Sequence, residues 1–358
     1  MSTLIIFLVL LSVLVIAHEF GHFFAARRAG MKVEEFGLGF PPRLWSWKDK
    51  KGTRWSLNLF PLGGFVKIKG ENGEEKEKDE TNFTAKSIPW RLLVLSGGII
   101  MNLIAAWALF SFGFATGIPA LVDSASTDPN AIISGMQVRI IEVQKDSPAA
   151  KAGLVPGDTL LRVNGQDVTS ATAVRDLLAQ NTSGAAVDLV LAEKTLTVTP
   201  TYSAELSKYI IGAAFVDTGM MRYPWYTAPL KGLEATMQAT KDVVVGLWTV
   251  LTGLIGSGKV AAELSGPVGI AVLTGQVAKM GFAYLLQFAA MLSINLAILN
   301  ALPIPALDGG RILFVLIEAI RRKPLSGRTE QTVHAIGFAL LIILVLCVTY
   351  RDVLGLLR

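Results

Sequence analysis

Long apolar stretches separated by polar segments are the main pattern along the chain. Such stretches occupy about residues 4–26, 92–116, 282–302 and 336–350. Since about twenty apolar residues are enough to cross the hydrocarbon core of a bilayer as a helix, the pattern predicts a polytopic α-helical membrane protein with about four transmembrane helices.

The polar segments between these spans differ in character. Residues 27–91 are basic and contain strand-like pieces, while residues 119–223 show the alternating patterns and turn signals of a separate soluble α+β domain. Residues 224–281 predict an amphipathic interfacial helix and a linker, because the apolar run at 243–256 is too short to span. The two halves of the membrane core are therefore expected at 1–118 and 282–358.

Composition and charge agree with this topology. Hydrophobic residues make up 52% of the chain and charged residues 17%, which argues against disorder and against a soluble protein. The segment from Arg27 to Arg91 holds fourteen Lys or Arg against nine Asp or Glu, so the positive-inside rule places it in the cytoplasm. The single cysteine, Cys347, excludes an internal disulfide, and no nucleic-acid-binding motif is present.

A metal-binding pattern stands near the end of the first span. His18, Glu19 and His22 form an H-E-x-x-H sequence, whose i, i+4 spacing puts both imidazoles on one helix face, where they can share a zinc ion. Glu19 can then act as the base for an attacking water. Ionisable residues inside a membrane helix are expensive and therefore indicate function.

A hydrolytic zinc site usually has three protein ligands, and Asp308 is the candidate for the third. It follows the span at 282–302 on the cytoplasmic side, after a segment that two prolines prevent from being helical. The alternative is that Asp308 only caps the helix that follows. His334 is interpreted as a helix-end or interfacial residue.

Together, four motifs carry a resemblance over nearly the whole chain: H-E-x-x-H, the glycine-rich run from Ser96 to Asn102, the S-G-P-V-G at 265–269 and the segment from Asn300 to Gly310. In this order they resemble the site-2 protease family of intramembrane zinc metalloproteases, of the bacterial regulator of sigma-E protease type. The resemblance implies zinc ligands His18, His22 and Asp308, with Glu19 as the catalytic base.

The resemblance also implies supporting parts. Asn102 and Asn300 would hold substrate or the oxyanion, or else only satisfy carbonyls at helix breaks. Residues Gly64, Phe65, Val66 and Lys67 would belong to a cytoplasmic membrane-associated β-hairpin whose edge pairs with an unwound substrate, or to an ordinary amphipathic hairpin. Residues 146–165 resemble part of a PDZ domain, which would dock a peptide or exclude bulky substrates. There is room for one such domain, whereas the enterobacterial protein carries two.

The expected activity is zinc-dependent hydrolysis of peptide bonds within transmembrane segments of single-pass or previously cleaved proteins, such as anti-sigma factors or signal-peptide remnants. The expected place is the bacterial inner membrane, with the active site towards the cytoplasm and the PDZ domain outside. Two other classes remain open: a non-catalytic PDZ membrane scaffold and a zinc-binding transporter.

Overall fold

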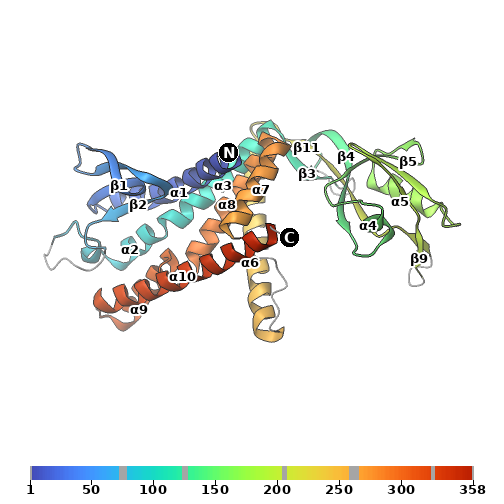
Figure 1. The fold of residues 1–358 in the computed structure, drawn as a ribbon. Helices are drawn as coiled ribbons and strands as arrows, with labels where there is room; N and C mark the ends of the chain where they lie inside the picture. The colour runs from blue at the N-terminus through green and yellow to red at the C-terminus, as the bar shows by residue number, and fades with distance from the viewer. Residues whose placement is uncertain are drawn as a thin grey trace. The chain divides into compact units, whose positions relative to one another are not determined.

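The computed structural model describes residues 2–71, 79–122, 128–203, 208–257, 266–323 and 327–356 (Figure 1). The chain forms two compact units. Unit 1 contains Met1–Phe112 and Pro229–Arg358, and unit 2 contains Gly113–Ala228. Ser265 of the S-G-P-V-G motif and residues 72–78 of the charged stretch after the hairpin lie outside the described residues.

Within the described residues, four helices are long and apolar enough to cross a membrane. They are α1 (Ser2–Arg28), α3 (Gly97–Thr116), α8 (Phe282–Ala301) and α10 (Gly327–Leu356). Twenty residues of helix are about 30 Å long, which matches the hydrocarbon thickness. The chain is therefore a polytopic helical membrane protein, although the first and last helices extend beyond the spans predicted at 4–26 and 336–350.

The span predicted at 92–116 is interrupted. It consists of the end of α2 (Ile88–Leu95) and of α3, with a break at Ser96. Residues 224–281 also differ from the expected single helix and linker, since they contain α6 (Ala228–Ser257) and a second helix, α7 (Pro267–Met280). Pro267 starts α7 at a position where a missing N–H costs nothing.

A sheet of two long strands follows α1. β1 (Val33–Lys48) and β2 (Arg54–Ile68) pair in an antiparallel arrangement with several register shifts. Residues 35–38 of β1 pair with residues 64–67 of β2 and also with residues 54–57, so they lie between two stretches of the same strand. β1 was missed entirely by the sequence prediction, which placed strand-like pieces only in the second strand.

Aromatic packing joins this sheet to α1. Phe36 is almost fully buried, and its ring centroid lies 4.8 Å from the rings of both Phe20 and Trp55. Phe23, Val94 and Val315 belong to the same buried cluster, which also reaches α9 (Asp308–Arg321). This core fixes α1, α2, α9 and the sheet around the H-E-x-x-H motif. A short 3₁₀ helix (Phe83–Ala85) precedes α2.

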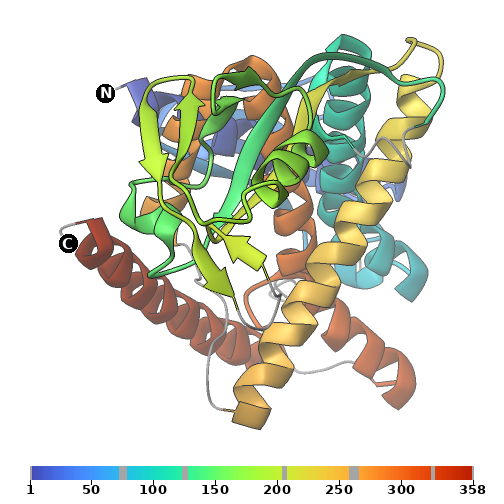
Figure 2. The ribbon, with the colours of Figure 1, turned by 90° about the vertical axis from the view of Figure 1, so that its right-hand side faces the viewer.

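Unit 2 is an α+β unit (Figure 2). Its main sheet has the order β3-β11-β4-β5-β7-β8, with β6 paired to β5, and β9 and β10 form a separate pair. Buried aliphatic residues such as Val138, Leu160, Val174 and Leu189 form its core. The elements are β3 (Ile118–Leu121), β4 (Ile132–Val143), α4 (Pro148–Lys151), β5 (Thr159–Val163), β6 (Gln166–Asp167), α5 (Ala171–Ala179), β7 (Val187–Leu191), β8 (Thr195–Val198), β9 (Thr201–Ser203), β10 (Lys208–Ile210) and β11 (Ala213–Arg222).

Candidate metal centre

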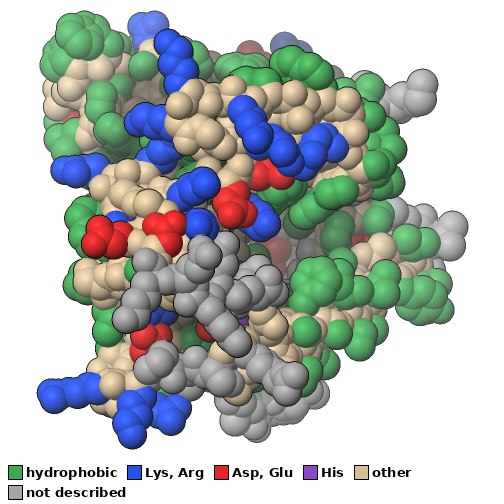
Figure 3. All heavy atoms as spheres, turned by 90° about the vertical axis from the view of Figure 1, so that its left-hand side faces the viewer, with side chains coloured by type: hydrophobic (Ala, Val, Ile, Leu, Met, Phe, Trp, Pro, Cys, Tyr) green, Lys and Arg blue, Asp and Glu red, His purple; other side chains and the backbone are tan. Residues whose placement is uncertain are grey.

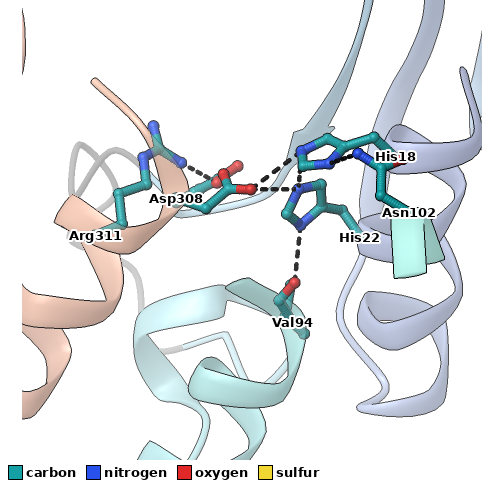
Figure 4. Close-up of polar contacts among 7 residues, drawn as sticks. His18, His22, Val94, Asn102, Asp308 and Arg311 are labelled. Carbon is teal, nitrogen blue, oxygen red and sulfur yellow. Dashed lines mark hydrogen bonds and ion pairs between the residues drawn. The ribbon is translucent and has the colours of Figure 1, made fainter. Parts of the chain in front are cut away.

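Three potential ligand atoms from α1 and α9 converge in unit 1 (Figure 4). The Nε2 atoms of His18 and His22 lie 3.1 Å apart, because residues four apart share one face of a helix. Asp308 Oδ2 lies 3.0 Å from Nε2 of His18 and 3.2 Å from Nε2 of His22. The structure thus brings together two residues that are close in sequence and a third that is 286 positions further along the chain.

The other ring nitrogen of each histidine, Nδ1, also has a polar contact. His22 Nδ1 lies 2.8 Å from the carbonyl oxygen of Val94, to which it can only donate. His18 Nδ1 lies 3.3 Å from the side-chain amide of Asn102, which is fully buried on α3. A hydrogen on Nδ1 of His22 leaves the lone pair of its Nε2 directed at Asp308, which is the tautomer that metal ligation requires. The atom of Asn102 that faces His18 is the donor Nδ2, while the buried Oδ1 of Asn102 has no partner among the described residues. Exchanging the two amide atoms would let Oδ1 accept from Nδ1 and give His18 the same tautomer.

Glycines let α3 approach α1 closely enough to complete the site. A Cβ atom on Gly21 would lie 2.0 Å from the carbonyl oxygen of Gly97. A Cβ atom on Gly98 would lie 2.5 Å from Nε2 of both His18 and His22. These helices can therefore meet only where they have no side chain, and the break at Ser96 places Gly97 and Gly98 at that point.

Asp308 is the first residue of α9 and points towards the imidazoles. The residue at the N-cap position is Leu307, and the helix has no side-chain cap hydrogen bond, so the alternative role of Asp308 as a cap is wrong. Burial alone would raise the pKa of Asp308, but His18 and His22, when their Nε2 atoms carry a hydrogen and donate to the carboxylate, outweigh burial and hold its pKa well below the usual range. The carboxylate is therefore ionised.

The arrangement fits a zinc ion. Asp308 Oδ2 is buried and has no hydrogen-bond partner among the described residues, although two imidazole nitrogens face it at hydrogen-bond distance. Ligand atoms about 2.0–2.1 Å from a tetrahedral zinc lie about 3.3 Å from one another, close to the three distances found here. Two imidazoles and one carboxylate are also a donor set found in catalytic zinc sites, where a fourth position stays open.

Glu19 and the second strand lie next to these atoms. A Cβ atom on Gly64 would be 3.4 Å from Cγ of Glu19, so the backbone of β2 passes directly beside this carboxylate. Residues 64–67 pair with residues 35–38 on one side, and the described residues provide no strand on the other side. Lys67 is exposed and forms an ion pair with Glu34 at 3.0 Å.

Asn300 makes no hydrogen bond to His18, His22 or Asp308 in the described part of the chain. It lies in the last turn of α8, is half-buried, and its side chain has no hydrogen bond within the described ranges. His334 lies within α10 rather than at a helix end, and its Nδ1 accepts a hydrogen bond from the backbone N–H of Ala306.

The sequence prediction missed other parts of the site. The acceptor on Val94 is a backbone carbonyl, and the ion pair between Arg311 and Glu71 joins α9 to the loop after β2. Neither contact has a local sequence signal, since each depends on helices and loops that are distant in the chain.

Comparison with known proteins identifies the family. A model of peptidase family M50 matches residues 6–344. The chain belongs to peptidase family M50. This confirms the resemblance to the site-2 proteases, and the M50 chain is accordingly a zinc-dependent metalloendopeptidase of the site-2 type.

Relatives extend over almost the full length of this M50 chain. A candidate zinc metalloprotease of Rhizobium meliloti is 32% identical over 371 residues, covering 97% of this chain and 95% of that protein. The regulator of sigma-W protease RasP of Bacillus subtilis is 31% identical, with 98% of each chain covered. The zinc metalloprotease RasP of Oceanobacillus iheyensis is 29% identical, with 99% of each chain covered.

A solved structure offers a more limited comparison. The PDZ domain of an SdrC-like protein of Listeria monocytogenes is 19% identical, with a TM-score of 0.22, and covers 24% of this chain and 92% of that one. The single PDZ domain expected at 119–223 stays a prediction.

Proposed function

We propose that this M50 chain hydrolyses peptide bonds within transmembrane segments, with His18, His22 and Asp308 as the zinc ligands and Glu19 as the base. The observation that carries the proposal is the convergence of three ligand atoms within 3.0–3.2 Å of one another next to Glu19, on a helix that can span the membrane. His22 lies six residues before Arg28, or about 9 Å along the helix, so the chemistry takes place below the membrane surface.

Zinc bound to these ligands would lower the pKa of a water molecule and polarise the scissile carbonyl. The residues next to the metal centre have different roles. Glu19 accepts a proton from the attacking water and delivers it to the leaving amide nitrogen. The carbonyl of Val94 accepts from Nδ1 of His22, and the side-chain amide of Asn102 contacts Nδ1 of His18, so both rings keep their orientation.

The edge of β2 supplies a place for the substrate. Gly64 to Lys67 form a strand whose second edge has no partner in the described part of the chain, and Gly64 lies beside Glu19. A substrate segment that leaves its helical form could add to this edge as a strand, since β-addition satisfies the backbone groups that unwinding exposes. Its carbonyl groups would then pass close to the catalytic base.

The charge distribution supports a cytoplasmic active site. Arg27 and Arg28 end α1, Arg321 ends α9, and Arg322 and Lys323 follow it. Lys and Arg side chains gather on the face of the molecule that carries β1, β2 and the end of α9 (Figure 3). With this end in the cytoplasm, unit 2 follows α3 on the extracytoplasmic side.

Unit 2 has a cavity that suits a peptide-binding role. The cavity has a volume of about 380 Å³ and is lined by Arg175 and Leu178 of α5 and by residues 208–215. An extended peptide could enter between a helix and a strand here, as in PDZ recognition, while steric exclusion of bulky ectodomains would need no such cavity. We propose single-pass or previously cleaved membrane proteins as substrates, including anti-sigma factors and signal-peptide remnants, as the family resemblance implies.

The experiment uses purified full-length protein in detergent and a single-span substrate. Glu19→Gln should bind zinc as well as the wild type and cleave nothing, whereas His22→Ala and Asp308→Ala should lose zinc. Zinc retained by both ligand variants would contradict the ligand assignment. Equal cleavage by the wild type and Glu19→Gln would contradict the assignment of the base, and a scaffold or a transporter would show no Glu19-dependent cleavage at all.

A further inference from the structure

The side chain of His334 on α10 contacts the segment that presents Asp308. Its Nδ1 lies 2.8 Å from the backbone nitrogen of Ala306, two residues before Asp308. We propose that His334 is a positioning residue, which holds the turn at Ala306 and thereby sets the place of Asp308 in the metal centre. This inference rests on the proposed role of Asp308 as a zinc ligand.

The backbone at Ala306 needs such support. Its φ angle is +78°, in the left-handed region that costs a non-glycine residue about 1–2 kcal/mol. Pro303 and Pro305 have no N–H groups, so the segment between α8 and α9 has few donors with which to fix itself. The N–H of Ala306 is one of these few, and its acceptor comes from a different helix.

The segment is enclosed from two directions by backbone. A Cβ atom on Gly310 of α9 would lie 2.4 Å from the carbonyl oxygen of Ile304. A Cβ atom on Gly337 of α10 would lie 2.7 Å from the carbonyl oxygen of Pro305. α10 therefore touches this segment directly, one turn after His334, and the imidazole of His334 accepts a hydrogen bond from the segment.

The hydrogen bond determines the tautomer of His334. Because Nδ1 accepts from Ala306, a neutral ring carries its hydrogen on Nε2, and this atom is buried without a partner among the described residues. A buried donor that lacks a partner costs about 1–3 kcal/mol. An apolar side chain would avoid that cost while still packing against Phe314, whose ring centroid lies 5.3 Å from the imidazole. The acceptor at Nδ1 is thus the property that distinguishes histidine at this position.

A displacement of the turn at Ala306 would shift the side chain of Asp308 by a similar amount. Ala306 and Asp308 are separated by one residue, and Asp308 begins the rigid helix α9. Metal–ligand distances in zinc sites lie within about 0.2 Å of their usual values. A small relaxation of the strained turn is therefore enough to weaken the third ligand while leaving His18 and His22 in place.

Three substitutions at position 334 distinguish the hydrogen bond that positions the turn at Ala306 from the packing of the ring. His334→Phe keeps a ring but has no acceptor. His334→Asn places its amide oxygen at the position of Nδ1, and His334→Gln carries its amide one bond further out. Phe338→Ala, at a position on α10 that is 60% exposed, is the matched control for changes in that helix.

We expect His334→Phe to weaken zinc binding about tenfold, in the range found for groups that orient metal ligands, measured by competition with a chelator. Hydrogen exchange at the Ala306 amide should become faster in the same variant, with or without zinc. His334→Asn should restore both values towards wild type, and His334→Gln should not. Catalysis should follow zinc occupancy, with KM for the substrate unchanged at saturating zinc.

Wild-type zinc affinity and wild-type exchange in His334→Phe would overturn the proposal, and so would equal rescue by Asn and Gln. If His334→Phe does not fold, the comparison of His334→Asn with His334→Gln decides the question by the same two measurements. Asp308→Ala in the same zinc assay distinguishes the ligand role of Asp308 from the positioning role of His334. Loss of zinc by Asp308→Ala with full retention by His334→Phe refutes only the positioning role, whereas retention by Asp308→Ala refutes the ligand assignment itself.

Discussion

Substitution of Gly98 by alanine tests whether the zinc ligands depend on the close approach of α3. The added Cβ atom would lie 2.4 Å from Cε1 of His18 and 2.5 Å from Nε2 of both His18 and His22. Ordinary contacts of a Cβ atom begin at 3.4 Å, so the rings or the helix must move by about 1 Å.

The size of the effect follows from that displacement. A shift of about 1 Å is several times the spread of about 0.2 Å found among zinc–ligand distances. We expect zinc affinity to fall by at least about 100-fold, the upper end of the losses seen when only a supporting group is removed. Helix propensity works in the opposite direction, because alanine favours a helix by about 0.8–1.0 kcal/mol over glycine.

The assay is chelator competition for zinc, with cleavage of a single-span substrate measured in parallel. Gly246→Ala in α6 is the matched control, because a Cβ atom there meets nothing within 4 Å. The control should bind zinc and cleave like the wild type. Wild-type zinc affinity in a folded Gly98→Ala protein would refute the reasoning, since it would mean that the ligands are not held against α3.

Further predictions concern the supports of the core. Asn102→Leu should weaken zinc binding by about 10- to 100-fold while leaving the fold intact, and unchanged affinity would contradict its role. Arg91 forms a 2.8 Å ion pair with Glu318 and is itself buried, so Arg91→Leu should cost about 3 kcal/mol in SDS-induced unfolding, most of which the second change Glu318→Leu should recover. The Lys69 amine and the Thr81 backbone hold the pKa of Asp79 well below its usual range, so its contribution is complete above about pH 4 and is lost as the pH falls through the lower folded-state value. The stability difference between wild type and Asp79→Asn should therefore shrink in acid, and a difference that grows would contradict this sign.

Much of the candidate site was predictable because its chemistry is local. The spacing of His18 and His22 determines which face they share, and the apolar runs around them indicate a membrane helix. Asp308 could be proposed only by placing the cytoplasmic ends of two spans at the same depth. The sequence could not predict its 3.0 Å approach to His18, because that distance depends on how α9 packs against α1.

Other features depend on contacts that no local pattern encodes. Gly98 resembles any small helix residue until α3 is placed against the imidazoles. His334 resembles an interfacial histidine until its Nδ1 meets the N–H of Ala306. β1 was missed for a similar reason, because Phe36 becomes a core residue only through the rings of Phe20 and Trp55 around it.

The position of the cleaved bond distinguishes proteolysis within the membrane from cleavage of soluble segments. Purified wild-type protein and Glu19→Gln, each loaded with zinc, are incubated with a single-span substrate, and the products are identified by mass spectrometry. We predict new termini inside the apolar span of the substrate with the wild type and none with Glu19→Gln. Termini only in the soluble flanks of the substrate, or the same products with Glu19→Gln, would contradict it.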